Sequence, residues 1–172
     1  MSCHTFATEQ RIAAAWLHDV VEDTGRTIED LYKADFPKST VDLVYELTAI
    51  YTKKNNPTLN REARKRLEFG RISTTSIWAK IIKCYDRIDN LRDMGLADAG
   101  FRRIYCEESL LLADALTQNV HRTVNGLHIE VMELADEIRT AAIEMMGHAP
   151  TLFGFGERSH YPLDGPPGAK GL

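Results

Sequence analysis

Hydrophobic side chains recur along this chain with the spacing of α-helices. In residues 43–50 the apolar positions fall at i, i+1, i+4 and i+7, which places them on one face of a helix. Periodicity and capping signals predict further helices over residues 11–23, 61–69, 77–93, 101–119 and 127–146, and a short one after Thr27 that stops before Pro37. No stretch alternates apolar and polar residues as a half-buried strand does. The pattern therefore predicts an all-α fold, a bundle of about six or seven helices.

Glycine and proline become frequent toward the end of the chain. Six of the 11 glycines and four of the 6 prolines lie in residues 147–172. This density without apolar periodicity is typical of a flexible tail. We therefore expect one helical domain over residues 1–146, followed by a Gly/Pro-rich tail over residues 147–172.

The helix predicted over residues 11–23 ends in a cluster of ionisable side chains. Glu22 and Asp23 follow His18 and Asp19 by one turn, so a continuous helix would place all four on one side. The other side would carry Ile12, Ala13, Trp16, Leu17 and Val20. An imidazole beside a carboxylate can hold a divalent cation, and further carboxylates can orient or deprotonate a water molecule. A solvated acidic face is the alternative interpretation of this spacing.

A second polar cluster lies on the apolar helix predicted over residues 77–93. Its apolar face would consist of Ile77, Trp78, Ile81, Ile82, Tyr85, Ile88 and Leu91. Asp86 and Asn90 project together at i, i+4, and Lys83 lies one turn earlier. A carboxylate at the edge of so apolar a face is costly to bury unpaired. We therefore expect a cation beside Asp86, supplied by a metal ion or by an arginine.

Together the two clusters resemble the HD-domain metal phosphohydrolases, and more narrowly the RelA/SpoT-type hydrolases of the stringent-response nucleotides ppGpp and pppGpp. Residues 18–23, HDVVED, are similar to the HD-x-x-ED signature of that family. Residues 83–94, KCYDRIDNLRDM, are similar to its K-x-x-D-R-x-x-N-L-R segment. The resemblance covers residues 12–116 and implies an HD-domain helical bundle. Its metal cleft would lie between the helices over residues 12–23 and 77–93.

The resemblance also implies a role for each polar residue of the cleft. His18, Asp19 and Asp86 would be the metal ligands, and this mixture of imidazole and carboxylate suits Mn²⁺ or a similar divalent ion. Glu22 and Asp23 would position a water molecule and take its proton. The implied reaction is hydrolysis of ppGpp or pppGpp to GDP or GTP plus pyrophosphate. Because no synthetase segment follows, we expect hydrolysis without synthesis.

Basic residues gather in one part of an otherwise acidic chain. They are Lys53, Lys54, Arg61, Arg64, Lys65 and Arg66. A solvated helix face would explain them, whereas the resemblance favours contacts with substrate phosphates. We rank Arg61 and Arg64 first because a spacing of i, i+3 places them on one face. Together with Lys83 and Asn90 they form the predicted binding set for a phosphorylated guanosine nucleotide.

Composition narrows the class of protein. A formal net charge of -4 argues against a general nucleic-acid binder. No apolar stretch approaches the ~20 residues needed to cross a bilayer, and the first residues lack the features of a signal peptide. Cys3, Cys84 and Cys106 are widely spaced without a C-x-x-C motif, which indicates reduced thiols. We therefore expect a cytoplasmic protein that acts on a nucleotide, without a membrane or nucleic-acid partner.

One element of the family pattern is missing. HD-domain enzymes use an additional histidine from a helix that precedes the HD motif. Upstream of His18 there is only His4, and thirteen residues separate the two. Residues 1–8 would span only ~12 Å as a helix, too short to turn back across the cleft. We therefore expect that His4 is not a ligand and that the chain begins downstream of the family's first helix.

That expectation has consequences for binding and assembly. Metal should bind more weakly than at a complete site, and apolar surface should be exposed where that helix would pack, which favours self-association into a homo-oligomer. The remaining histidines are expected to be surface or boundary residues; they are His121, His128, His148 and His160. Two alternative functions stay open, an HD phosphohydrolase for another nucleotide and a catalytically weakened HD binding or regulatory module.

Overall fold

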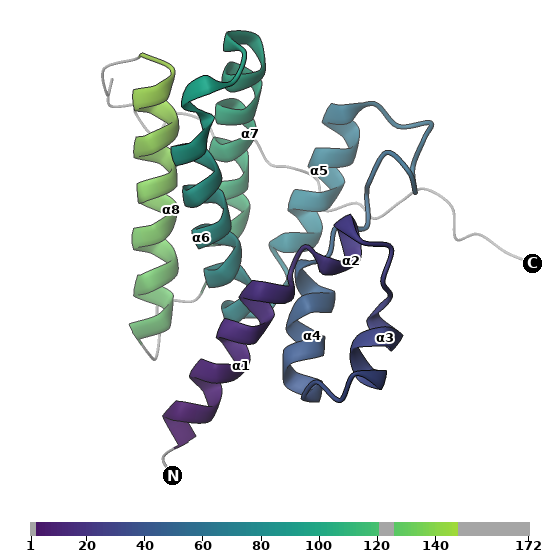
Figure 1. The fold of residues 1–172 in the computed structure, drawn as a ribbon. Helices are drawn as coiled ribbons and strands as arrows, with labels where there is room; N and C mark the ends of the chain where they lie inside the picture. Colours follow the sequence, from purple (N-terminus) through teal and green to yellow (C-terminus); the bar gives the residue numbers. More distant parts are fainter. Residues whose placement is uncertain (1–2, 121–125, 148–172) are drawn as a thin grey trace, which may run out of the picture.

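The computed structural model describes residues 3–120 and 126–147, with side chains described for residues 9–120 and 127–147. These residues form eight α-helices and one 3-10 helix and contain no strand, which confirms the predicted all-α bundle (Figure 1). Within the same residues, no helix has the length and apolar content that a membrane crossing requires. The side chains of His4, His121, His148 and His160 and most of the predicted tail lie outside the described part, so the expectations for them stay predictions.

The helices follow the predicted order along the chain. The first half contains α1 (Cys3–Leu17), α2 (Val20–Asp23), α3 (Ile28–Lys33) and α4 (Lys38–Leu47). The second half contains α5 (Arg61–Ile72), α6 (Ile77–Asp93), η1 (Met94–Leu96), α7 (Ala99–Thr117) and α8 (Gly126–Met145). Figure 1 shows α6, α7 and α8 side by side, with α1 crossing near the start of α6 and α3–α4 lying beyond α1.

Side-chain caps fix where several of these helices begin. Thr27 forms a capping box with Asp30 at the start of α3, as the sequence predicted. Asn60 accepts a 2.8 Å hydrogen bond from the backbone N–H of Ala63 and so caps α5. Ser76 caps α6 in the same way, which sets the start of the helix that contains Asp86.

Helix α6 belongs to two hydrophobic clusters at once. Ile88 and Leu91 pack into a cluster with α5, α7 and α8, while Ala79 and Ile82 pack into a second cluster with α1, α3 and α4. Burying a Leu or Ile side chain contributes about 1.5–3 kcal/mol relative to exposure. Because α6 is fixed from both sides, any group on its remaining polar edge is held by a rigid element.

The first predicted helix is not continuous, which corrects one expectation. Helix α1 ends at Leu17, His18 and Asp19 form a turn, and α2 is a separate helix of one turn. Nδ1 of His18 lies 2.7 Å from the carbonyl oxygen of Ala15. That oxygen is the acceptor that a continuing helix would use for the N–H of Asp19. In this structure the imidazole of His18 contacts the Ala15 carbonyl oxygen, and the chain turns at residues 18 and 19.

The predicted apolar faces were wrong at several positions. The helix predicted over residues 43–50 ends at Leu47, which leaves Ile50 outside it and 43% exposed. Trp16 is 82% exposed and Ile12 is 53% exposed, so the buried contact of α1 is made instead by Ala14. On α6, Tyr85 is exposed, and its hydroxyl lies 3.4 Å from a carboxylate oxygen of Glu130. The exposed side chains on α1 agree with the predicted apolar surface, while self-association stays a prediction.

Candidate functional site

The turn between α1 and α2 directs His18 toward α6. Its Nε2 lies 3.1 Å from Oδ2 of Asp19 and 3.4 Å from Oδ1 of Asp86. Nδ1 contacts the carbonyl oxygen of Ala15. Nε2 is therefore the ring nitrogen that faces the two carboxylates. The carboxylate of Asp86, 3.4 Å away, raises the pKa of His18 against the opposing effect of burial, and Ala15 and Asp19 act in the same direction as Asp86.

Asp86 is the most enclosed acid of this cluster. Its Oδ2 lies 2.8 Å from Nζ of Lys83, and Nδ2 of Asn90 donates a 2.7 Å hydrogen bond to its Oδ1. Burial alone would raise the pKa of Asp86. The neighbouring His18 and the ammonium of Lys83 outweigh burial and hold the pKa of Asp86 well below its usual range. Asp86 is therefore ionised at neutral pH and is available as a ligand.

The three predicted metal ligands meet at one place. One ligand atom from each of His18, Asp19 and Asp86 lies within 4.8 Å of the other two. Nε2 of His18 is buried and has no hydrogen-bond partner of good geometry among the described residues. A buried imidazole nitrogen without a partner, flanked by two carboxylates, is the donor set that a divalent ion requires. The residues present therefore fit a metal ion.

The two acids of α2 lie differently from each other. Oε1 of Glu22 accepts a 2.7 Å hydrogen bond from the backbone N–H of Ala49, just beyond the end of α4. This contact fixes the Glu22 side chain and leaves its second oxygen free of partners among the described residues. Asp23 is exposed. Neither acid belongs to the metal-ligand cluster, in agreement with the separate role that the sequence predicted for them, although no observation tests that role.

Lys83 and Asn90 lie on either side of Asp86 along α6. Lys83 is largely buried and pairs with Asp86, so its charge is directed at the cluster. The amide nitrogen of Asn90 is used by Asp86, which leaves the amide oxygen of Asn90 as an exposed acceptor. The predicted spacing of these residues around Asp86 is correct, because it depends only on the helix.

The structure separates the two predicted arginines of α5. Nε and Nη2 of Arg61 donate to the two carboxylate oxygens of Glu108 on α7, at 2.6 and 3.0 Å. Nη1 of Arg64 donates to the backbone oxygen of Leu59, at the end of the preceding loop. The predicted shared face at i, i+3 is therefore not used, because the carbonyl of Leu59 draws Arg64 back along its own helix.

Sequence reasoning listed Lys65 among the basic residues without ranking it and did not identify Glu108. Lys65 lies one turn after Arg61, and its Nζ is 3.9 Å from Oε2 of Glu108. Burial lowers the pKa of Lys65, while Glu108 acts to raise it. Glu108 itself is only 8% exposed. A lone acid on an apolar helix face is the signal that could have revealed a buried ion pair.

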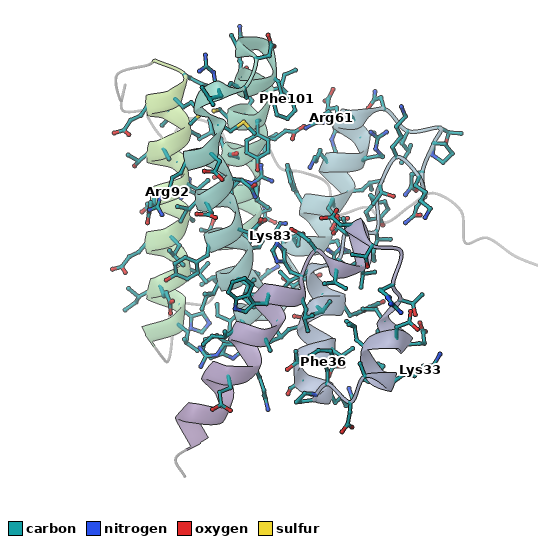
Figure 2. The ribbon with its side chains drawn as sticks, viewed as in Figure 1. Lys33, Phe36, Arg61, Lys83, Arg92 and Phe101 are labelled. Carbon is teal, nitrogen blue, oxygen red and sulfur yellow. The ribbon has the colours of Figure 1, made fainter. Side chains whose placement is uncertain are left out.

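A pocket of about 340 Å³ is lined in part by His18 and Asp86. Its lining comes from α1, α6 and α8 and includes Ala15, Tyr85, Arg92 and Glu137. Figure 2 shows Arg92 on the α8 side of α6, whereas Arg61 lies on the side of α5 that faces α7. Two of the candidate metal ligands, His18 and Asp86, therefore line this pocket together with Arg92 of α6.

Comparison with known proteins finds relatives that are described as guanosine-3′,5′-bis(diphosphate) 3′-pyrophosphohydrolases, one of them as probable. The chain is 32% identical to guanosine-3′,5′-bis(diphosphate) 3′-pyrophosphohydrolase MESH1 of Drosophila melanogaster over 124 residues, 72% of this chain and 65% of the relative. It is 36% identical to the Homo sapiens MESH1 over 83 residues, 48% of this chain and 42% of the relative. It is 31% identical over 131 residues, 73% of this chain, to a probable guanosine-3′,5′-bis(diphosphate) 3′-pyrophosphohydrolase of Mycoplasma pneumoniae, of which it covers 17%.

The chain thus spans less than two thirds of the length of these relatives. No family model matches the chain. No solved structure matches it either.

Proposed function

We propose that this chain, which is 32% identical over 72% of its length to a guanosine-3′,5′-bis(diphosphate) 3′-pyrophosphohydrolase, belongs to that family of hydrolases and hydrolyses ppGpp and pppGpp. Water would cleave the bond between the 3′ oxygen and the adjacent phosphorus, giving GDP or GTP and pyrophosphate. The observation that supports this most directly is the meeting of His18, Asp19 and Asp86 around the buried Nε2 of His18.

The family implies a divalent metal ion, and His18, Asp19 and Asp86 would hold it. We propose Mn²⁺, since a mixed set of one imidazole and two carboxylates suits that ion. Such an ion supplies positive charge that lowers the pKa of a neighbouring water molecule. Asn90 and Lys83 hold Asp86 in its orientation, so their part in this site includes positioning the ligand.

Proton transfer would fall to Glu22 or Asp23. The hydrogen bond from Ala49 fixes the Glu22 carboxylate on α2, the helix that follows the turn with His18 and Asp19. A carboxylate oriented in this way can accept a proton from an attacking water molecule. Asp23 is the second acid that can perform the transfer.

Basic side chains would bind the phosphates. Lys83 lies beside Asp86, and Arg61 and Lys65 lie on α5 across from α7. Positive groups at these places would neutralise the substrate and the charge that develops on pyrophosphate as it leaves. We propose a phosphorylated guanosine nucleotide as the partner, without nucleic acid, and a cytoplasmic location.

A parallel assay tests the proposal. The purified chain is incubated with ppGpp, dGTP and nucleoside monophosphates, each with Mn²⁺ and with a chelator. We expect pyrophosphate release from ppGpp only, and only with the metal. Phosphate release from another nucleotide would instead support an HD phosphohydrolase of different specificity. Absence of turnover with all of them would support a binding or regulatory module.

A further inference from the structure

Glu108 is a buried acid that contacts two cations of a different helix. It lies on α7 with only 8% of its surface exposed, while the side chains of Arg61 and Lys65 on α5 are 48% and 35% exposed. The carboxylate of Glu108 is thus buried, whereas the side chains of Arg61 and Lys65 are partly exposed to solvent. In Figure 2, Arg61 points from α5 toward α7 and lies near Phe101.

The contact leaves most of the Arg61 guanidinium available. A guanidinium has five N–H donors, and Glu108 accepts from two of its nitrogens, Nε and Nη2. The remaining donors stay in a fixed plane because the bidentate contact prevents rotation of the group. The ring of Phe101, 5.8 Å from the guanidinium carbon, limits the movement of Arg61 further. A long side chain that is already ordered loses less freedom when it binds a phosphate.

The pair lies within electrostatic reach of the metal-ligand cluster. Tyr105, one turn before Glu108 on α7, has a pKa raised first by burial, with Asp86 and Glu108 both acting in the same direction and Arg87 opposing them. Lys65 in turn interacts with Lys83, which contacts Asp86 directly. The contact between α6 and α7 is direct, because the guanidinium of Arg87, the residue after Asp86, lies 4.3 Å from the centre of the Tyr105 ring.

We propose that Glu108 is a positioning residue, which holds Arg61 beside Lys65 as a preorganised two-cation pair for a phosphate group of the nucleotide. This inference rests on the proposed function, which already gives Arg61 and Lys65 as phosphate contacts, and adds to it Glu108 as the group that orders the pair. Glu108 acts through Arg61 and does not touch the substrate.

Two effects of removing the Glu108 charge oppose each other. Loss of a nearby negative charge would by itself favour a phosphate and lower KM. Loss of the bidentate contact would free Arg61 and raise KM, and the positioning role requires that the second effect exceed the first. In a protein that already lacks Arg61 there is nothing left to position, so only the first effect can appear.

The experiment is therefore a double-mutant cycle on ppGpp hydrolysis with saturating Mn²⁺. We expect Glu108→Gln to raise KM about tenfold, the scale of a lost charge-assisted hydrogen bond, with kcat nearly unchanged. In the Arg61→Ala background the same substitution should raise KM by less than about twofold, or should lower it. Glu107→Gln is the matched control, because Glu107 is the adjacent, exposed acid of α7 and pairs with Arg103 at 3.0 Å. It should leave KM unchanged.

The proposal is wrong if Glu108→Gln leaves KM unchanged or lowers it in the parent chain. It is equally wrong if KM rises by the same factor with and without Arg61. An inactive parent chain would contradict the proposed function, and an activity-independent measurement then decides the positioning role.

That measurement uses the unmodified protein and also applies if Glu108→Gln does not fold. Nε of Arg61 and Nε of Arg103 each contact a glutamate, but only Glu108 is buried. By NMR, the Nε–H of Arg61 should exchange with water at least about tenfold more slowly than that of Arg103, and should keep this protection when inorganic pyrophosphate is added. Equal exchange rates, or loss of protection with pyrophosphate, would overturn the proposal.

Discussion

Nδ1 of His18 lies 2.7 Å from the carbonyl oxygen of Ala15, at the end of α1, and this contact orients the imidazole. Because Nδ1 is occupied, Nε2 is the nitrogen presented to Asp19 and Asp86. In a continuous helix, Asp19 would follow His18 by ~100° around the axis. The turn instead brings the Asp19 carboxylate to 3.1 Å from the same nitrogen. The break in the helix is thus what assembles the candidate ligands.

Asp86→Ala should remove the metal site. Asp86 is the acid that joins α6 to His18, and its loss leaves one imidazole and one exposed carboxylate. We expect Mn²⁺ affinity, measured by calorimetric titration, to fall by more than the ~10–100-fold that loss of a supporting residue causes. Asp93→Ala, an exposed acid of the same helix, is the control and should bind Mn²⁺ as the parent does. Unchanged affinity in Asp86→Ala would rule out Asp86 as a ligand.

Glu22→Gln should separate catalysis from structure. The amide oxygen of glutamine can still accept the hydrogen bond from Ala49, so the free energy of unfolding and the Mn²⁺ affinity should remain close to those of the parent. The substitution removes the proton acceptor, and we expect kcat to fall by about 10²–10⁴-fold. Steady-state kinetics with ppGpp and chemical denaturation measure the two quantities. Hydrolysis at the parent rate would show that Glu22 takes no part in proton transfer.

Arg61→Ala and Arg64→Ala should have different effects, although the two residues are three positions apart. Arg61 faces α7 and has donors left for a phosphate, so its loss should raise KM for ppGpp about tenfold. Arg64 is used by the carbonyl of Leu59, so its loss should lower the free energy of unfolding by about 1 kcal/mol and leave KM nearly unchanged. Equal increases of KM in both variants would contradict this distinction.

Features that depend on local spacing could be predicted from the sequence. The bounds of α6 follow from apolar periodicity, and the structure has the helix at the predicted residues. Helical geometry likewise predicts that Lys83 and Asn90 lie beside Asp86, as they do. The cap at Asn60 follows equally from residue type. The assignment of catalytic, binding and ligand roles to these residues stays a prediction.

Features that depend on a competing or distant partner could not be predicted. The break after Leu17 coincides with a contact between a side chain and a backbone carbonyl, which periodicity does not describe. Arg61 and Glu108 are 47 positions apart, so their pairing exists only once α5 and α7 pack together. The exposure of Trp16 likewise depends on which helices lie beside α1.

Trp16→Ser should weaken self-association of the chain. Trp16 and Ile12 lie at i, i+4 on one face of α1, and both are largely exposed. A tryptophan can bury ~150–250 Å² when it meets a partner, so an exposed one favours contact between copies. Removing it should raise the dissociation constant of the self-associated form at least about tenfold, as expected for an aromatic residue at the centre of an interface.

Sedimentation velocity over a range of protein concentrations measures this effect. Tyr45→Ser is the matched control, because Tyr45 is another exposed aromatic residue, at 60%, on a different helix, α4. It should leave the dissociation constant within about twofold, and both substitutions should change the free energy of unfolding by no more than about 0.5 kcal/mol since neither side chain is buried. A monomeric parent chain at every concentration, or equal effects of the two substitutions, would show that the exposed face of α1 does not drive association.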